Sequence, residues 1–390
     1  MKLGFYYHIP AVITENQIKL PGFLGVFISA LAKEVDSLVL ILHQADKHYE
    51  QFCDYELISK NITVINLGYK TPAWHREFFH KKILKTALRQ AEICDAIIIR
   101  SPTPLAAYFH KYVKHPELWF LIVGDYLEGT EHYLKSGLRN KLIYFYLKVN
   151  NYFFQKRIPF TNVLVNSPAL LKKYTPVAKR IHLIKSTTLN EIDLYYREDT
   201  CQNNRTNILF TGRFAYNKGL VELFEALNKL ILIKEKDFYL HLAGWEDDVN
   251  KPVENKLREL AEKLKITDRV IFHGRKKVGT DLNAMYRSCD IYVLPSYHEG
   301  FPRTIWEAMA NSLPVIATSV GGIPEYLEHE THALLIPPKN VEALVEAIKR
   351  IINDKGLRKK LIYNGFELAK STTLEIQTKK LVQIIKQQFP

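Results

Sequence analysis

Short apolar runs alternate with polar, helix-like stretches through the first half of the chain. The runs consist mainly of Ile, Leu, Val and aromatic residues, as buried parallel strands do. Apolar residues recur at helical spacing between several runs, for example over Phe23–Lys33. The predicted strands are Lys2–Ile9, Leu38–Leu42, Ile62–Leu67, Ala96–Ile99, Trp119–Val123 and Val163–Asn166. This alternation predicts a doubly wound parallel sheet of the α/β class.

The second half repeats the alternation after Ser186–Arg205, a polar stretch that we interpret as an interdomain linker. Strands are predicted at Asn207–Phe210, Phe238–Ala243, Val270–Phe272, Ile291–Leu294 and Val315–Ala317. Helices are predicted at Leu220–Leu230, Thr304–Asn311, Asn340–Asn353, Leu357–Ala369 and Leu374–Gln388. The pattern therefore indicates a second α/β domain.

Length and composition fit two globular domains. The chain has 390 residues, of which 47% are hydrophobic, which is ample for two packed cores. No run of eighteen apolar residues is present, and Pro10 interrupts the segment where a signal peptide needs its apolar centre. We therefore expect a cytoplasmic protein. Four scattered cysteines without a Cys-x2-Cys pair argue against a zinc site and a disulfide framework.

The positive charge lies almost entirely in the first half. Residues 1–190 contain 25 Lys and Arg against 14 Asp and Glu, a net charge of +11 out of the total of +13. A basic surface attracts polyanions, including acidic glycans and anionic membrane leaflets. Solvated lysines without a partner would explain the same composition. We expect no nucleic-acid partner.

Two stretches of the first half interleave aromatic residues with Arg and Lys. They are Thr71–Lys85 and Gly137–Arg157. Helices at membrane interfaces have this chemistry, with rings at the level of the headgroups and cations toward anionic lipid. The alternative is that Ile143, Tyr146 and Leu147 cover the sheet while the lysines face water. Both interpretations stay open, since one helix has room for both faces.

The second half contains a dense motif, HEGFPRTIWEAMANSLPVIATSVGGIPE, which begins at His298. Glu299 lies in the loop after one predicted strand, and Glu307 lies about a turn into the next helix. The carboxyl ends of parallel strands are where open α/β sheets bind ligands, and the start of a helix favours an anion. Gly321-Gly322 follows the next strand and would let backbone approach a ligand closely. Each feature alone is ordinary strand–turn–helix chemistry, but their combination and order predict a functional site.

This motif resembles the donor site of retaining nucleotide-sugar glycosyltransferases of the GT-B fold, in glycosyltransferase family 4 (glycosyl transferases group 1), with their Glu-x7-Glu motif. The resemblance implies that Glu299 contacts hydroxyls of the transferred sugar and Glu307 the ribose hydroxyls. TGRFAYNKG resembles the diphosphate clamp, with Gly212 at the turn and Arg213 and Lys218 on the leaving nucleotide. The implied donor site consists of Gly212, Arg213, Lys218, Arg275, Glu299, Gly300, Phe301, Pro302 and Glu307. Ser312 stands where the family usually has Gly.

The resemblance also implies two Rossmann-like domains that face each other across a cleft. Residues 1–187 would form an acceptor-binding domain, joined by the C-terminal helix at about 374–390, and residues 188–373 a donor-binding domain. Many relatives have a His-Asp pair near the reacting sugar, where this chain has Gly124 and Asp125. Asp125 is then the second catalytic candidate beside Glu299, and His8 could lie close by.

Two common sequence motifs for binding a metal ion or a dinucleotide are missing, which excludes some classes of enzyme. No two aspartates are spaced Asp-x-Asp, so the metal clamp of the other common glycosyltransferase fold is absent, as is a Gly-x-Gly fingerprint. We expect a retaining transferase that needs neither a metal ion nor another cofactor. Its donor would be a UDP-sugar or, secondarily, a GDP-sugar. Its acceptor would be a glycan or a lipid-linked molecule in polysaccharide, lipopolysaccharide or glycolipid synthesis. The rivals are an epimerase or phosphorylase of the same fold and a non-catalytic sugar-nucleotide or glycan-binding protein.

Overall fold

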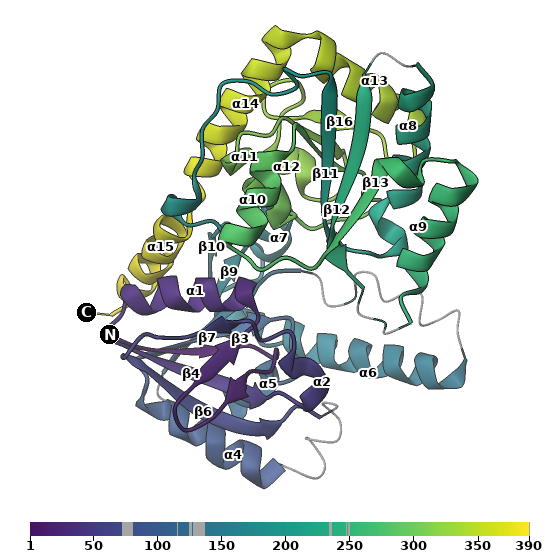
Figure 1. Cartoon of the computed structure of the whole chain (residues 1–390). Coiled ribbons are helices and arrows are strands. Elements are labelled where there is room, and N and C mark those ends of the chain that lie inside the picture. Colours follow the sequence, from purple (N-terminus) through teal and green to yellow (C-terminus); the bar gives the residue numbers. More distant parts are fainter. Residues whose placement is uncertain are drawn as a thin grey trace. The chain divides into compact units, whose positions relative to one another are not determined.

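The computed structural model describes residues 1–71, 81–114, 116–124, 127, 137–233, 236–246, 248 and 250–389. The chain divides into two compact units (Figure 1). The N-terminal unit comprises Met1–Ser186 and Glu375–Pro390, and the C-terminal unit comprises Thr187–Leu374. Each unit contains one parallel sheet with helices packed on it.

The N-terminal unit is built on a seven-stranded sheet in the order β10-β9-β8-β7-β1-β4-β6. Its strands are β1 Lys2–Tyr6, β4 Ser37–Gln44, β6 Ile62–Tyr69, β7 Ala96–Ser101, β8 Glu117–Ile122, β9 Asn162–Val165 and β10 Arg180–Leu183. Its described helices are α1 Gly22–Lys33, α2 Lys47–Glu50, α4 Lys81–Gln90, α5 Ala106–Tyr112, α6 Leu138–Gln155, α7 Pro168–Tyr174 and α15 Leu374–Lys386. Neighbouring strands of this sheet pair in parallel, which confirms the predicted doubly wound sheet.

Both faces of this sheet are buried, because successive side chains of a strand point to opposite faces. Along β7, Ile97 and Ile99 belong to one core cluster, whereas Ala96 and Ile98 belong to another. The first cluster includes side chains of α4, α5 and α6, and the second includes side chains of α1 and α15. Burial on both faces explains why these strands appear in the sequence as continuous apolar runs.

A small antiparallel sheet in the N-terminal unit was not predicted. It consists of β2 Val12–Ile13, β3 Ile18–Leu20 and β5 Tyr55–Glu56 in the order β2-β3-β5. Strands of two or three residues are too short to give a periodic signal. Tyr55 also explains Gly25, because a Cβ at Gly25 would lie 2.3 Å from the Tyr55 ring. Gly25 is therefore needed for helix packing.

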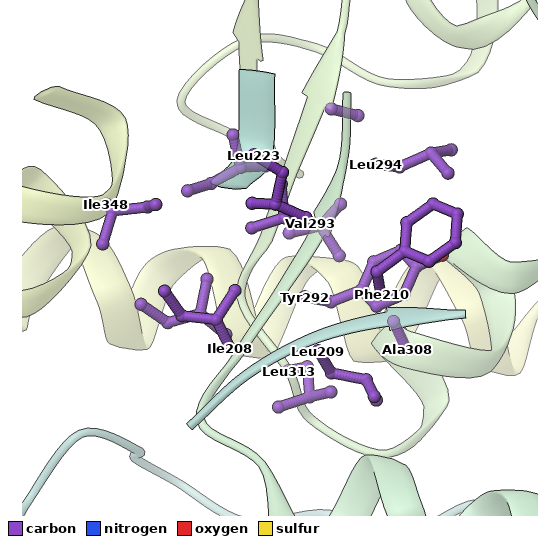
Figure 2. Close-up of a cluster of buried hydrophobic side chains, with 14 of the residues drawn as sticks. Ile208, Leu209, Phe210, Leu223, Tyr292, Val293, Leu294, Ala308, Leu313 and Ile348 are labelled. Atoms are coloured by element: carbon purple, nitrogen blue, oxygen red, sulfur yellow. The ribbon is translucent and has the colours of Figure 1, made fainter. Parts of the chain in front are cut away.

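The C-terminal unit has a six-stranded sheet in the order β13-β12-β11-β14-β15-β16. The strands are β11 Arg205–Arg213, β12 Asp237–Trp245, β13 Val270–Gly274, β14 Ile291–Leu294, β15 Val315–Thr318 and β16 Leu334–Ile336. The helices are α8 Leu220–Ile233, α9 Pro252–Lys263, α10 Thr280–Ser288, α11 Arg303–Ala310, α12 Ile323–Tyr326, α13 Val341–Asn353 and α14 Lys355–Lys370. Figure 2 shows side chains of β11 and β14 packed with α8, α11 and α13 in the single core of this unit.

The predicted interdomain linker, Ser186–Arg205, begins where the chain passes from the N-terminal unit to the C-terminal unit. Almost all of it belongs to the C-terminal unit and makes specific contacts there. The Asp199 carboxylate accepts hydrogen bonds from Arg358 Nε at 2.6 Å and Nη2 at 3.1 Å, and both side chains are buried. Ser312 has φ of +57°, and its hydroxyl donates to Tyr195 O and accepts from Arg197 N–H. These contacts come from positions distant in the sequence, so the polar composition of the segment did not indicate them.

Candidate functional site

The strand order of the C-terminal unit reverses between β11 and β14, which are neighbours in the sheet. In open α/β sheets, ligands bind at the carboxyl ends of the strands where the order reverses. The loop after β11 contains Lys218, and the loop after β14 contains Glu299. The topology therefore brings two charged loops, far apart in sequence, to one edge of the sheet.

Lys218 and Glu299 form a partly buried ion pair at this edge. Lys218 Nζ donates to Glu299 Oε1 at 2.5 Å, and the two side chains are 18% and 11% exposed. Ser296 Oγ donates to the same oxygen at 2.7 Å. Limited exposure reduces the screening of the pair by water, while some surface of both groups stays accessible to a ligand. The pair presents a fixed cation beside a carboxylate that can accept hydrogen bonds from a diol.

Backbone contacts hold the two loops together. Gly219 has φ of +64°, and a Cβ there would lie 2.0 Å from Pro295 O. Tyr297 N–H donates to Asn217 O at 2.8 Å. Only glycine fits so close an approach in this conformation. The position of Lys218 relative to Glu299 is therefore fixed by backbone geometry as well as by the ion pair.

Gly321 and Gly322 support the loop that contains Glu299. Gly321 has φ of +52°, and a Cβ there would lie 1.7 Å from Glu299 O. Gly322 N–H donates to Gly300 O at 2.7 Å. The close approach that the glycine pair permits is thus to another loop of the protein. This contact differs from the predicted approach to a ligand, and it positions Glu299 from the side of β15.

Glu307 lies in a buried hydroxyl network. Its carboxylate, 8% exposed, accepts from Thr188 Oγ1 at 2.5 Å and from Tyr286 OH at 2.9 Å. Thr211 Oγ1 lies 2.7 Å from Tyr286 OH. Burial, and secondly the charge of Glu307, raise the pKa of Tyr286, so its phenol stays protonated and serves as a donor. A carboxylate has about four acceptor positions, so Glu307 keeps acceptor capacity for a ligand diol.

Tyr292 of β14 connects the surroundings of the two glutamates. Its phenol lies 3.3 Å from Thr211 Oγ1, and its ring is fully buried. Burial is the largest cause of the raised pKa of Tyr292, and the negative charges of Glu307 and Glu299 both raise it further. Tyr292 thus adjoins the hydroxyl network of Glu307 through Thr211, and it lies in the strand whose following loop contains Glu299.

The remaining predicted residues lie at the ends of the same elements. Gly212 (φ of +144°) and Arg213 end β11, and Arg213 is exposed. Arg275 follows β13, with its guanidinium 5.4 Å from the centre of the Trp245 ring. Phe301 stacks on Trp306 with ring centroids 4.3 Å apart.

Two predictions need separate comment. Pro302 is the N-cap residue of α11. Asp125 lies outside the described residues. The C-terminal unit thus brings Lys218 and Glu299 into contact and places Glu307 in a neighbouring network, and the ligand roles of all these residues stay predictions.

Sequence reasoning missed three residues of these networks: Thr188, Tyr286 and Ser296. Thr188 lies 119 positions from Glu307 in a segment interpreted as linker, so no local pattern indicated it. Tyr286 is one aromatic residue within a helix pattern. Ser296 could have been found, because it lies three residues before Glu299 in a strand-to-helix loop.

The N-terminal unit has a corresponding reversal of strand order, between β1 and β7. Tyr7 and His8 directly follow β1, and their ring centroids lie 4.6 Å apart. The Arg100 guanidinium of β7 lies 4.7 Å from the centre of the Tyr7 ring. This edge is a second place where an open α/β sheet binds ligands.

Two kinds of feature are absent from the described residues. None of the described helices is long and apolar enough to span a membrane. Among the same residues, no three His, Cys, Asp or Glu side chains group in a way that could hold a metal ion.

Each unit has a parallel sheet whose strand order reverses, as in Rossmann-like domains. The crystal structure of Anabaena HepE in complex with UDP matches with a TM-score of 0.71 at 17% identity, over 99% of this chain and 100% of that one. At this identity the match establishes the fold. The predicted GT-B fold is thereby confirmed.

Residues 196–368 match the family model of glycosyl transferases group 1. An uncharacterized glycosyltransferase of Methanocaldococcus jannaschii is 32% identical over 164 residues, 42% of this chain and 40% of that protein. The lipopolysaccharide core biosynthesis mannosyltransferase LpsB of Rhizobium meliloti is 32% identical over 146 residues, 37% of this chain and 40% of that protein. The match spans about 40% of the length of each relative. The C-terminal unit therefore matches glycosyl transferases group 1 over most of its length, as its motif predicted.

Proposed function

We propose that this protein transfers a sugar, with retention and without a metal ion, from a nucleotide diphosphate donor to a glycan or lipid-linked acceptor. The observation on which this rests is the Lys218–Glu299 pair at the strand-order reversal of a glycosyl transferases group 1 unit. Such a pair can bind the two parts of a sugar nucleotide, with the cation on phosphate and the carboxylate on sugar hydroxyls.

The C-terminal unit would bind the donor. As the glycosidic C–O bond breaks, negative charge grows on the leaving diphosphate, and fixed cations at Lys218 and Arg213 would stabilise it. Glu299 would orient the sugar, and Glu307 would accept hydrogen bonds from the ribose hydroxyls. The UDP complex of HepE supports a uridine nucleotide as the first donor to test, with GDP as the alternative.

The N-terminal unit would bind the acceptor. Its positive charge suits an acidic glycan or an acceptor held at an anionic membrane surface. LpsB is named for lipopolysaccharide core biosynthesis, which supports an acceptor of the cell-surface polysaccharide or glycolipid class. We place the reaction at the cytoplasmic face of a membrane.

Thermal stabilisation by UDP, GDP and ADP tests the donor site. At about a hundredfold excess over its dissociation constant, the true nucleotide should add about 2.7 kcal/mol to the unfolding free energy. Arg213→Ala and Glu307→Ala should each reduce this gain. Arg205→Ala is the matched control, because Arg205 begins the strand that Arg213 ends. Equal stabilisation of all four proteins would contradict the assignment.

Product analysis then separates the reactions. Transfer to an acceptor with the anomeric configuration of the donor supports the proposal. An altered sugar formed without acceptor would indicate an epimerase, and release of a sugar phosphate would indicate a phosphorylase. Nucleotide binding without turnover on any acceptor would support a binding protein.

A further inference from the structure

Helix α6, Leu138–Gln155, uses only one of its two apolar faces for packing in its own unit. Leu147 and Phe154 are seven residues apart and join the core of the N-terminal unit. Phe154 is 2% exposed, and its ring centroid lies 5.0 Å from that of Phe120 in β8. Figure 1 shows α6 extending past the sheet of its unit. This face explains the position of the helix.

A second apolar row runs along the opposite side of α6. Leu142, Phe145, Val149 and Tyr152 follow one another at intervals of three and four residues, so they form one continuous stripe. At about 100° per residue, the stripe lies roughly opposite Leu147 and Phe154. Leu142, Phe145 and Tyr152 are 62%, 66% and 54% exposed, and the adjoining Phe153 is 50% exposed. A contiguous exposed apolar stripe of this size is typical of an interaction surface.

The charge of the helix indicates the kind of partner. Residues 137–157 contain five cations, Arg139, Lys141, Lys148, Lys156 and Arg157, and no Asp or Glu. Lys148 Nζ lies 5.4 Å from the centre of the Tyr144 ring, and Lys156 Nζ lies 4.5 Å from that of Tyr152. Cations held next to aromatic rings on an exposed helix suit a layer of anionic headgroups above hydrocarbon.

We propose that the exposed face of α6 docks the protein onto an anionic lipid bilayer, with the Phe145 and Phe153 rings in the interfacial layer and the lysines among the headgroups. A second copy of the chain would bring five cations against five, which repel one another, whereas a bilayer offers an apolar layer and negative charge together. This face would hold the enzyme at the membrane where the proposed sugar transfer takes place. Only the identity of the acceptor rests on that proposed function.

Vesicle flotation without nucleotide tests the docking face. The protein should float with phosphatidylcholine vesicles that contain about 30% phosphatidylglycerol, bind phosphatidylcholine alone much more weakly, and dissociate as salt rises. The double variant Phe145→Ser/Phe153→Ser should lower the partition coefficient at least about tenfold, and Lys141→Gln/Lys148→Gln should remove the preference for anionic lipid. The matched control is Ile192→Ser/Leu232→Ser, which removes two side chains of the C-terminal unit that are 89% and 68% exposed.

Unchanged flotation of the double phenylalanine variant would overturn the proposal. So would a concentration-dependent dimer, measured by light scattering without lipid, that this variant abolishes, because it would identify a second copy as the partner. Stabilisation by UDP is measured on the same samples. If the double phenylalanine variant no longer floats but is still stabilised by UDP, the docking face and the donor site are supported separately. If the parent protein floats normally but no nucleotide stabilises it, only the proposed sugar transfer is contradicted.

Discussion

The two glutamates of the motif, eight residues apart, have different surroundings. Glu299 shares one oxygen with a cation and a hydroxyl at a partly exposed edge. Glu307 is buried and accepts from the Thr188 and Tyr286 hydroxyls. If the Lys218–Glu299 pair separates, Lys218 can bind a phosphate and Glu299 can accept from a sugar hydroxyl. Glu307, held between two hydroxyls, is fixed in orientation before a ligand arrives. The Thr188 hydroxyl is therefore a positioning group for Glu307.

Replacement of Thr188 by Val should weaken nucleotide binding about five- to thirtyfold. The change keeps the shape of the side chain and removes one hydrogen bond to a charged acceptor, which costs about 1 to 2 kcal/mol. The dissociation constant of the bound nucleotide, measured by calorimetry, checks this expectation. Thr188→Ser retains the hydroxyl and should bind normally. Equal affinities of the Val variant and the parent protein would show that Glu307 needs no orientation by Thr188.

Two half-buried histidines make stability depend on pH. Burial, and secondly Arg157, lower the pKa of His110 to about 4, and burial and then His273 lower the pKa of His241 to about 4. His110 Nε2 lies 2.7 Å from Thr161 Oγ1, and His241 Nδ1 lies 2.9 Å from His273 Nε2. Since the unfolded chain takes up protons near pH 6.5 and the folded protein does not, this stability is complete above pH 6.5 and is lost as pH falls toward 4.

Each histidine should therefore cost about 2 kcal/mol of unfolding free energy between pH 7 and pH 5. Urea unfolding at the two pH values measures the loss. His110→Gln and His241→Gln should each make stability less dependent on pH, whereas His48→Gln on the exposed surface of α2 should not. If stability depends on pH equally in His110→Gln, His241→Gln and the parent protein, these two histidines are not the cause of the dependence.

At the scale of elements, strand prediction succeeded where burial on both faces makes a run continuously apolar. β14 has the predicted bounds Ile291–Leu294, and β15, β11 and β12 extend the predicted runs by a few residues. β16, Leu334–Ile336, was missed because its three residues depend on pairing with β15. The positions of the two glutamates, Arg213 and Lys218 could be predicted because each lies in a short sequence motif that directly follows a predicted strand. The hydroxyls around Glu307 could not, since they come from distant segments.

The glycine pair after β15 offers a test of how one element positions another. Gly321→Ala should destabilise the protein by about 2 to 4 kcal/mol, from the left-handed conformation and from the clash with Glu299 O. Gly274→Ala is the matched control, because Gly274 has φ of +65° but nothing within 4 Å of its missing Cβ. It should cost only the conformational term of about 1 kcal/mol. If urea unfolding shows the same loss of unfolding free energy for both variants, the loop that contains Glu299 can move away from the added methyl group without cost.

At the scale of the whole molecule, charge and binding chemistry are divided between the two units. The excess of Lys and Arg and the exposed stripe of α6 belong to the N-terminal unit, whereas the ion pair and both glutamates belong to the C-terminal unit. The units also have separate hydrophobic cores, with one cluster in the C-terminal unit and two in the N-terminal unit. A bound nucleotide and a bound membrane should therefore protect different backbone amides of the chain from hydrogen exchange.

Hydrogen exchange of the intact protein can resolve this division. UDP should slow exchange in residues 212–220 and 296–304, because a ligand at the carboxyl ends of β11 and β14 stabilises both loops against local opening. Anionic vesicles should slow exchange in residues 137–157 and leave those loops unchanged. The Phe145→Ser/Phe153→Ser variant should lose only the vesicle effect, and Glu307→Ala should lose only the UDP effect. Protection by UDP that is confined to the N-terminal unit would contradict the proposed site, because the nucleotide would then bind at the carboxyl ends of β1 and β7 instead.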